Sequence, residues 1–255
     1  MPLTFAHPAA VIPFCRKSRY INFSAMVLGS MAPDFEYFLR GQPIGEIGHT
    51  FTGFFLLNLP LVLMIYFIYH QIIRLNVIHH LPTFLQDTSS YKVEGSKTWK
   101  TVVFCYSAII GMLTHVVWDS FTHMHGFMVM SFPTLSHTFN VYGYQIPIYK
   151  FLQHGSTLFG ISLIIGYMFY RASLNKNKDT SKISAKKKLY FWALLVILTL
   201  LYVSIWCMID WVPISSYGKI VVRFIDSFFG SLLTICLVIT YHQKKSDYRN
   251  KKVLS

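Results

Sequence analysis

The sequence is poor in acidic side chains. Its 255 residues include only ten Asp and Glu, and charged residues make up 13% of the chain, whereas ordinary soluble domains have about 25%. Hydrophobic residues reach 53%. This balance excludes an ordinary soluble domain and predicts an integral membrane protein.

Cysteines are few and scattered. The four are Cys15, Cys105, Cys207 and Cys236, no two of them form a CxxC pair, and three lie within apolar segments. This excludes a disulfide framework and a cysteine zinc cage, so the cysteines are expected to be small core hydrophobes. The first residues also lack the basic start and apolar segment of a secretory signal, and we expect the mature chain to begin near Met1.

Long apolar runs are what the sequence has in abundance. A membrane helix needs ~20 predominantly apolar residues. Five runs approach or reach that length, at 51–69, 102–118, 157–170, 190–209 and 220–241. We predict an all-α, polytopic membrane bundle of about five spanning helices. A short N-terminal helix at 23–31 cannot span and is expected to be re-entrant or interfacial. The chain is expected to form a single membrane domain over 1–255, with the polar motifs in 1–156 and plain hydrophobic helices in 157–255.

The net charge of +13 is concentrated in two places, the loop 171–188 and the tail 244–252. Basic residues beside membrane helices are typical of cytoplasmic loops, so both stretches are expected to be cytoplasmic. A tail that binds nucleic acid is the alternative. We expect no nucleic-acid partner, because lysines beside membrane helices usually set topology. Counting helices from the basic loop places the polar motifs near the outer face.

One apolar segment contains three side chains of the metal-ligand type. His115, Asp119 and His123 stand at i, i+4 and i+8, so on a helix they share one face. Imidazole and carboxylate bind zinc and related metals, and burying them without a partner is costly. The two histidines would lie ~12 Å apart along the helix axis, too far for one ion. Asp119 lies midway and can bridge two ions. The alternative is a polar stripe that hydrogen-bonds to neighbouring helices.

Three more ligand-type residues lie in separate motifs. His7 precedes Pro8, Asp34 follows Pro33, and His49 stands just before the first long apolar run. Each has a structural explanation: a helix cap for His7, a helix start favoured by the macrodipole for Asp34, and an interfacial position for His49. Their combination in a chain with so few acids favours a shared metal site.

Four motifs together resemble a known family. They are TFAHPAA at 4–10, GSMAPDFEYF at 29–38, GHT at 48–50 and THVVWDSFTH at 114–123. They resemble a bacterial membrane-protein family, a domain of unknown function, over nearly the whole chain. More distantly, their order is similar to the membrane-bound metal-dependent hydrolases related to the LexA-binding inner-membrane family. It is also similar to the zinc-dependent phospholipases C and nucleases, which are all-helical.

The resemblance implies a divalent metal centre with one or two ions, zinc first and manganese second. The implied ligands are His7, Asp34, His49, His115 and Asp119, with His123 or His125 as another.

A catalytic role is expected for Asp119 and His123. His154 starts a helix on the same side and is expected to be an extra ligand or a general acid/base. No acid stands four residues after His137 or His154, so a complete three-metal site is not expected. Glu36 and Thr50 are expected to support the ligands.

The leading hypothesis is a membrane-embedded metal-dependent hydrolase that acts on a phosphoester, such as that of a lipid. The alternatives are a metal-handling or transport protein, whose buried polar residues line an ion path, and a non-catalytic membrane scaffold.

In the last apolar segment, Arg223 and Asp226 are expected to pair with each other. The expected partners are the lipid bilayer and a lipid or phosphoester substrate. The expected location is the bacterial inner membrane, with a cytoplasmic C-terminus.

Overall fold

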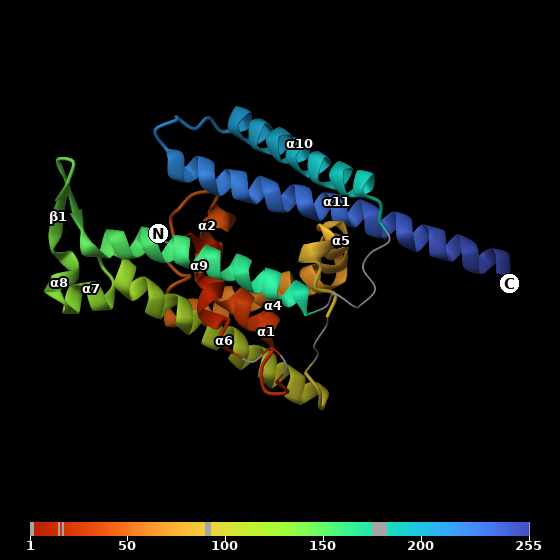
Figure 1. Cartoon of the computed structure of the whole chain (residues 1–255), viewed down its shortest axis with the longest axis horizontal. Helices are drawn as coiled ribbons and strands as arrows, with labels where there is room; N and C mark the ends of the chain where they lie inside the picture. Colours follow the sequence, from red (N-terminus) through yellow and green to blue (C-terminus); the bar gives the residue numbers. More distant parts are fainter. Residues whose placement is uncertain (1–2, 15, 17, 90–92, 175–182, 255) are drawn as a thin grey trace. The chain divides into compact units, whose positions relative to one another are not determined.

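The computed structural model describes residues 3–14, 16, 18–89, 93–174 and 183–254, and helices account for most of them (Figure 1). Cys15 and part of the basic loop, with Lys176, Lys178 and Lys182, lie outside the described residues. The elements in chain order are η1 (Thr4–Val11), α1 (Phe23–Gly29), η2 (Ala32–Asp34), α2 (Phe35–Arg40), α3 (Phe51–Gly53), η3 (Phe54–Asn58), α4 (Leu59–Ile68), η4 (Tyr69–Ile73), α5 (Arg74–His80), η5 (Thr83–Leu85), α6 (Lys97–Thr122), α7 (Phe127–Ser131), α8 (Pro133–Ser136), β1 (Thr138–Val141), β2 (Tyr144–Pro147), α9 (Ile148–Ser173), α10 (Ala185–Ile209) and α11 (Tyr217–Leu254).

Four helices among the described residues are long and apolar enough to cross a membrane. They are Phe51–His80, which joins α3 to α5 without a break, Lys97–Thr122, Ala185–Ile209 and Tyr217–Ser246. The fifth expected span lies in α9, a continuous 26-residue helix that is not among the four. Polar residues interrupt it near both ends, including Gln153 and Arg171, so its apolar run is shorter than the ~20 residues a span needs. The expected count of five is therefore not confirmed.

A small hairpin departs from the all-α prediction. Strands β1 and β2 pair antiparallel, with Val141 opposite Tyr144. Tyr142 and Gly143 form the turn, both with positive φ, at 51° and 86°. The Asn140 side chain accepts a hydrogen bond from the Gly143 amide at 2.9 Å. A two-residue turn with both φ values positive suits the twist of a hairpin. In the sequence, the pair Tyr142-Gly143 is the local feature that indicates this turn.

The chain forms two compact units. The first comprises Met1–Glu36, Gly45–Tyr66 and Ser90–Tyr170, and the second comprises Tyr37–Ile44, Phe67–Ser89 and Arg171–Ser255. The single domain with a division near residue 156 stays a prediction. All the ligand-type residues singled out above, from His7 to His154, belong to the first unit.

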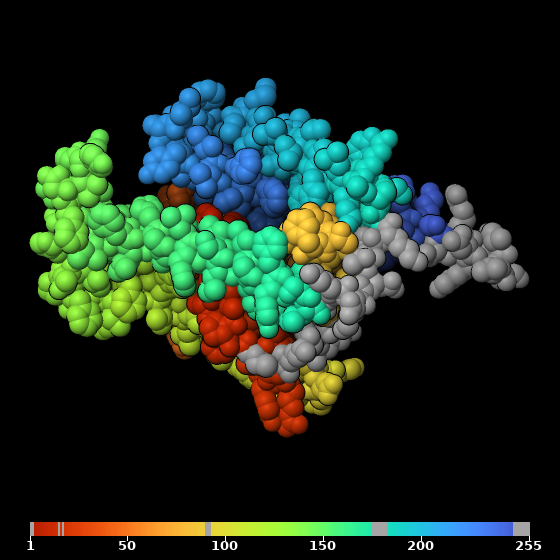
Figure 2. Space-filling model, in the orientation of Figure 1, coloured from red at the N-terminus to blue at the C-terminus, as the bar shows by residue number. Residues whose placement is uncertain are grey.

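In the first unit, the short helix α1 packs along α6. A Cβ on Gly29 would lie 2.1 Å from the Ala108 carbonyl oxygen, and one on Gly111 would lie 2.2 Å from the Met26 carbonyl oxygen. The two backbones therefore approach as closely as they do because glycine stands on each helix. The Asn22 side chain caps α1 by accepting from the Ala25 amide at 3.1 Å. The green residues of α9 lie against red N-terminal residues (Figure 2). A Cβ on Gly160 of α9 would lie 2.9 Å from the Ala6 carbonyl oxygen.

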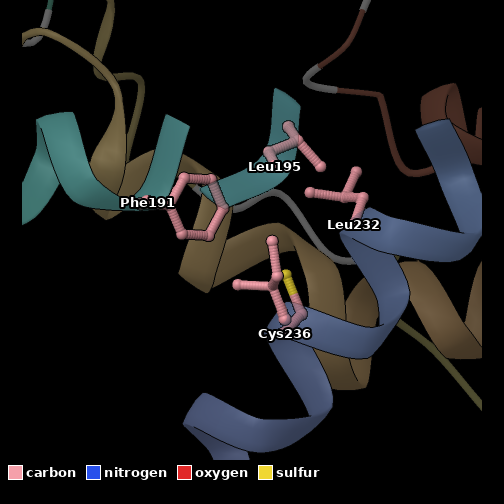
Figure 3. Packing of buried hydrophobic residues seen from close by; sticks show 5 residues of the cluster. Phe191, Leu195, Leu232 and Cys236 are labelled. Atoms are coloured by element: carbon pink, nitrogen blue, oxygen red, sulfur yellow. The ribbon is translucent and has the colours of Figure 1, made fainter. Parts of the chain in front are cut away.

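In the second unit, α10 and α11 pack side by side (Figure 1). Phe191 and Leu195 of α10 meet Leu232 and Cys236 of α11 in a buried apolar cluster (Figure 3). Cys236 is a free, fully buried thiol, as expected of a core cysteine.

The expected pair between Arg223 and Asp226 is wrong. Arg223 instead forms an ion pair with Asp210 and also donates to the Asp210 carbonyl oxygen at 2.6 Å. Asp210 directly follows α10, and the loop after it returns the chain to the start of α11. The long guanidinium therefore finds both a carboxylate and a free helix-end carbonyl there.

Candidate metal centre

Three segments of the first unit bring four ligand-type side chains together. Asp34 comes from the end of η2, His49 from the loop before α3, and His115 and Asp119 from α6. One ligand atom from each of these four residues lies within 4.8 Å of the others. The sequence prediction that these residues converge is confirmed for these four.

The Asp119 carboxylate lies at the middle of the cluster. Its Oδ2 atom lies 3.2 Å from His115 Nε2 and 3.7 Å from His49 Nε2. Its Oδ1 atom lies 3.5 Å from both His7 Nε2 and His123 Nδ1. Each oxygen of one carboxylate thus faces its own pair of imidazoles, which is the arrangement expected of a bridging ligand.

The Asp34 carboxylate completes one side of the cluster. Its Oδ1 atom lies 3.6 Å from both His49 Nε2 and His115 Nε2. Its Oδ2 atom accepts a hydrogen bond from the Thr4 hydroxyl at 2.6 Å. Burial raises the pKa of Asp34 above its ordinary value, because the charged form loses its hydration. A cation beside Oδ1 would compensate that loss.

His115 is held in one orientation by the backbone. Its Nδ1 atom lies 2.8 Å from the Ser30 carbonyl oxygen. A carbonyl only accepts, so Nδ1 donates the proton and Nε2 keeps its lone pair for the cluster. Ser30 directly follows α1, so the close packing of α1 on α6 sets this contact.

His7 closes the buried side. Its side chain is 1% exposed and its ring stacks on the His115 ring, with centroids 3.8 Å apart, while the Trp118 ring meets it edge-on. Burial, and then the neighbouring His115, lowers the pKa of His7 to about 3. The ring is therefore neutral at physiological pH and can offer a lone pair to a metal.

The loop that carries His49 is tied down by two buried side chains. The Oε2 atom of Glu36 accepts hydrogen bonds from three successive amides, those of Glu46, Ile47 and Gly48, at 3.0, 2.8 and 2.8 Å. The Asn58 amide donates to the Gly48 carbonyl oxygen at 2.6 Å. The expectation that Glu36 supports a ligand thus has a geometric basis, because it holds the backbone on which His49 stands.

Two further features shape the same loop. A Cβ at Gly48 would lie 2.3 Å from the Pro33 carbonyl oxygen, so only glycine lets the loop approach the segment that carries Asp34. Thr50 begins α3, where its hydroxyl accepts from the Gly53 amide at 3.0 Å and donates to the Ile47 carbonyl oxygen at 2.7 Å. Thr50 therefore caps the helix that follows the His49 loop.

His123 lies just beyond the end of α6 rather than on it. The helix ends at Thr122, and His123 has extended backbone angles, φ −118° and ψ 142°. This break turns the ring back toward Asp119, so Nδ1 comes within 3.5 Å of the carboxylate and 3.1 Å of the Asp119 carbonyl oxygen. Burial lowers the pKa of His123, so its ring is also neutral.

The remaining predicted histidines stand apart. His125, His137 and His154 have exposed side chains, and none belongs to the group of ligand atoms found among the described residues. The proposed role of His154 as a ligand or acid/base is left untested by these contacts.

The unpaired atoms of the cluster support a metal. Of the buried side-chain atoms without a hydrogen-bond partner among the described residues, five belong to the cluster: both ring nitrogens of His7, Asp34 Oδ1, His115 Nε2 and Asp119 Oδ1. Donor atoms ~2.0–2.2 Å from one tetrahedral ion lie about 3.3–3.6 Å from each other. The separations of 3.2 to 3.7 Å around Asp119 and Asp34 match that spacing. The donor set therefore fits a divalent metal ion.

Residues 1–240 match the family DUF4184, described as a domain of unknown function. The match covers nearly the whole chain, so this protein belongs to that family. No curated protein and no solved structure matches the chain.

Proposed function

We propose that this chain is a membrane-embedded, metal-dependent hydrolase of phosphoesters whose centre binds two zinc ions bridged by Asp119. The observation that carries the proposal is the division of the Asp119 carboxylate, with each oxygen facing a separate pair of imidazoles at 3.2 to 3.7 Å. The resemblance of the motif order to metal-dependent membrane hydrolases, which was drawn from the sequence alone, favours the same proposal.

The first ion would take four protein ligands. These are Asp34 Oδ1, His49 Nε2, His115 Nε2 and Asp119 Oδ2, the group whose atoms lie within 4.8 Å of each other. The second ion would take Asp119 Oδ1 and His7 Nε2. His123 Nδ1 would be the third ligand in the tautomer that carries its proton on Nε2, which gives up the 3.1 Å hydrogen bond from Nδ1 to the Asp119 carbonyl oxygen. Three protein ligands leave a position open, as in catalytic zinc sites, whereas structural sites are closed by four.

The mixture of imidazole and carboxylate favours zinc. Imidazole suits zinc, copper, iron and nickel, whereas magnesium and calcium prefer all-oxygen sites. Manganese, which accepts more carboxylate and water, is the second choice. No thiolate is available among the ligand group.

Access to the centre is one-sided. The side chains of His49 and His123 are 32% and 30% exposed, whereas those of His7, Asp34 and His115 are at most 1% exposed. A substrate would therefore approach past His49 and His123, and His7 with Trp118 would exclude water from the rear. Two bound metal ions supply an activated water and neutralise the charge that develops on a phosphoester.

The experiment is metal analysis and hydrolysis together. Detergent-purified wild type should hold zinc and hydrolyse bis(p-nitrophenyl) phosphate. Asp119→Asn keeps the shape but removes the charge, so zinc affinity should fall by more than the ~10–100-fold seen when a residue behind the ligands is changed. Asp87→Asn is the matched control, because Asp87 pairs with Arg171 in the other unit.

The outcomes separate the alternatives. A folded wild type that holds no metal under any loading condition would leave the scaffold as the explanation. Metal binding without hydrolysis of any phosphoester would favour a metal-handling protein.

A further inference from the structure

An apolar hollow runs along the outside of α6, beside the centre. Its volume is about 590 Å³, within the range of sites for small molecules. One wall is the exposed face of α6, and the other is supplied by η1 and α9. The lining from α6 is mainly Ile110, Leu113, Val117, Trp118 and Phe121, with Ala10 from η1 and Leu152 from α9.

The polar atoms of this lining are already used within the protein. The Trp118 indole N–H donates to the Ser156 hydroxyl at 3.1 Å. The Thr114 hydroxyl donates to the Gly111 carbonyl oxygen at 2.7 Å, and the Thr122 hydroxyl to the Trp118 carbonyl oxygen at 3.4 Å. The hollow therefore offers almost no hydrogen bonds to an occupant, which favours a hydrocarbon over a polar ligand.

The hollow borders the metal centre at two residues, Trp118 and Thr122. Trp118 forms its wall and also meets the His7 ring edge-on, with centroids 5.6 Å apart. Thr122 lies at its far end, and its hydroxyl lies 3.3 Å from His123 Nδ1 at the accessible edge of the centre. From Ile110 to Thr122 the helix rises about 18 Å, which is long enough to lie beside an extended acyl chain.

We propose that this hollow binds an acyl chain of a membrane lipid and so presents the phosphoester of the lipid headgroup to the metal centre. The inference rests on the proposed function and narrows its substrate to a lipid. It is favoured because α6 is one of the helices able to cross a membrane, where hydrocarbon is the surrounding medium. An apolar wall that leads to a hydrolytic centre would guide a lipid and would not hold a soluble phosphoester.

The first test locates the chain directly. The purified protein is incubated with phosphatidylglycerol that has a diazirine midway along one acyl chain, irradiated, and digested. Cross-links should map to α6 between Ile110 and Thr122. Val117→Trp should reduce them about tenfold, because a bulky ring takes the volume of several methylenes. Val196→Trp is the control, since Val196 on α10 is 57% exposed and Val117 is 58% exposed.

The second test compares two substrates. Val117→Trp should lower the ratio of phosphatidylglycerol turnover to bis(p-nitrophenyl) phosphate turnover by about tenfold, and Val196→Trp should leave that ratio unchanged. If the wild type hydrolyses neither substrate, the proposed function fails while the cross-links still test the hollow. Cross-links that map elsewhere, or a ratio that Val117→Trp leaves unchanged, would overturn the acyl-chain site. A change in oligomeric mass on Val117→Trp would also overturn it and make the hollow a contact between copies.

Discussion

The Nε2 atom of His115 lies 3.2 Å from Oδ2 of Asp119, one helical turn further along α6. The geometry of the helix alone brings these two side chains onto one face. Every other ligand must come from another part of the chain. The centre is therefore a local pair on α6 that the folding of η1, η2 and the His49 loop completes.

Removing His7 should remove one ion and leave the other. In the proposed centre only the second ion depends on His7, whereas His115 serves the first. His7→Phe keeps the volume and the ring contact with Trp118, so the fold should persist. Zinc per chain, measured by mass spectrometry of the purified protein, should fall from two to one, and His137→Phe should retain two. A His7→Phe protein that still holds two ions would exclude His7 as a ligand.

Truncating Glu36 should loosen the loop that carries His49. Glu36→Ala leaves three amides without their acceptor, that of Gly48 buried and those of Glu46 and Ile47 partly buried, at a cost of roughly 2 kcal/mol. The melting temperature should fall by roughly 4–8 °C, and zinc affinity by ~10-fold. Glu36→Gln keeps an acceptor oxygen and should restore part of both.

Glu94→Ala is the control for that experiment, because Glu94 is exposed in the linker before α6. If Glu36→Ala lowers the melting temperature but leaves zinc affinity as in the wild type, Glu36 supports the fold without positioning His49.

The residues that converge in the cluster could be predicted from the sequence, but the residues that hold them in place could not. His115 and Asp119 follow from helical spacing, and Asp34 and His49 stood out as charged or ligand-type groups beside apolar runs. Ser30 and Thr4 gave no signal, since their contacts with His115 and Asp34 span 85 and 30 residues of sequence. Such contacts depend on how elements pack, which no local pattern encodes.

Asn58 is the support that the sequence could have revealed. It is a polar residue inside the first long apolar run, it is fully buried, and it holds the Gly48 carbonyl. A polar side chain within a membrane helix is expected to have a specific partner. The sequence did not reveal that α6 ends at Thr122, because the helical spacing of His115, Asp119 and His123 continues past that residue. His123 lies near Asp119 because the chain turns after the helix, and this turn is visible only in the structure.

The contact between α1 and α6 should be intolerant of one extra methyl group. Gly111→Ala would place a Cβ 2.2 Å from the Met26 carbonyl oxygen, so α1 must move away from α6 and take the Ser30 carbonyl from His115. We expect a melting temperature lower by several degrees and weaker zinc binding. Gly166→Ala on α9 is the control, since nothing lies within 4 Å of a Cβ there. Equal stability and zinc affinity in the two variants would show that α1 does not hold His115 in place.

If α9 is the fifth span that the sequence predicts, the centre should lie on the side of the membrane opposite the C-terminus. With the four spans Phe51–His80, Lys97–Thr122, Ala185–Ile209 and Tyr217–Ser246 alone, the centre and the C-terminus would share one side. His49 precedes the span Phe51–His80 and His123 follows the span Lys97–Thr122. Because these two residues meet at Asp119, the start of one span and the end of the next lie on the same side. The lysines of the basic loop and the tail indicate that the C-terminus is cytoplasmic.

A fluorescent protein fused after Ser255 should therefore fold and fluoresce, and a phosphatase active only outside the cytoplasm should be inactive there. In a cysteine-free background, an impermeant maleimide should label His125→Cys on intact cells and Glu94→Cys only after permeabilisation. Labelling of Glu94→Cys but not of His125→Cys on intact cells would place the centre on the cytoplasmic side and reverse the topology.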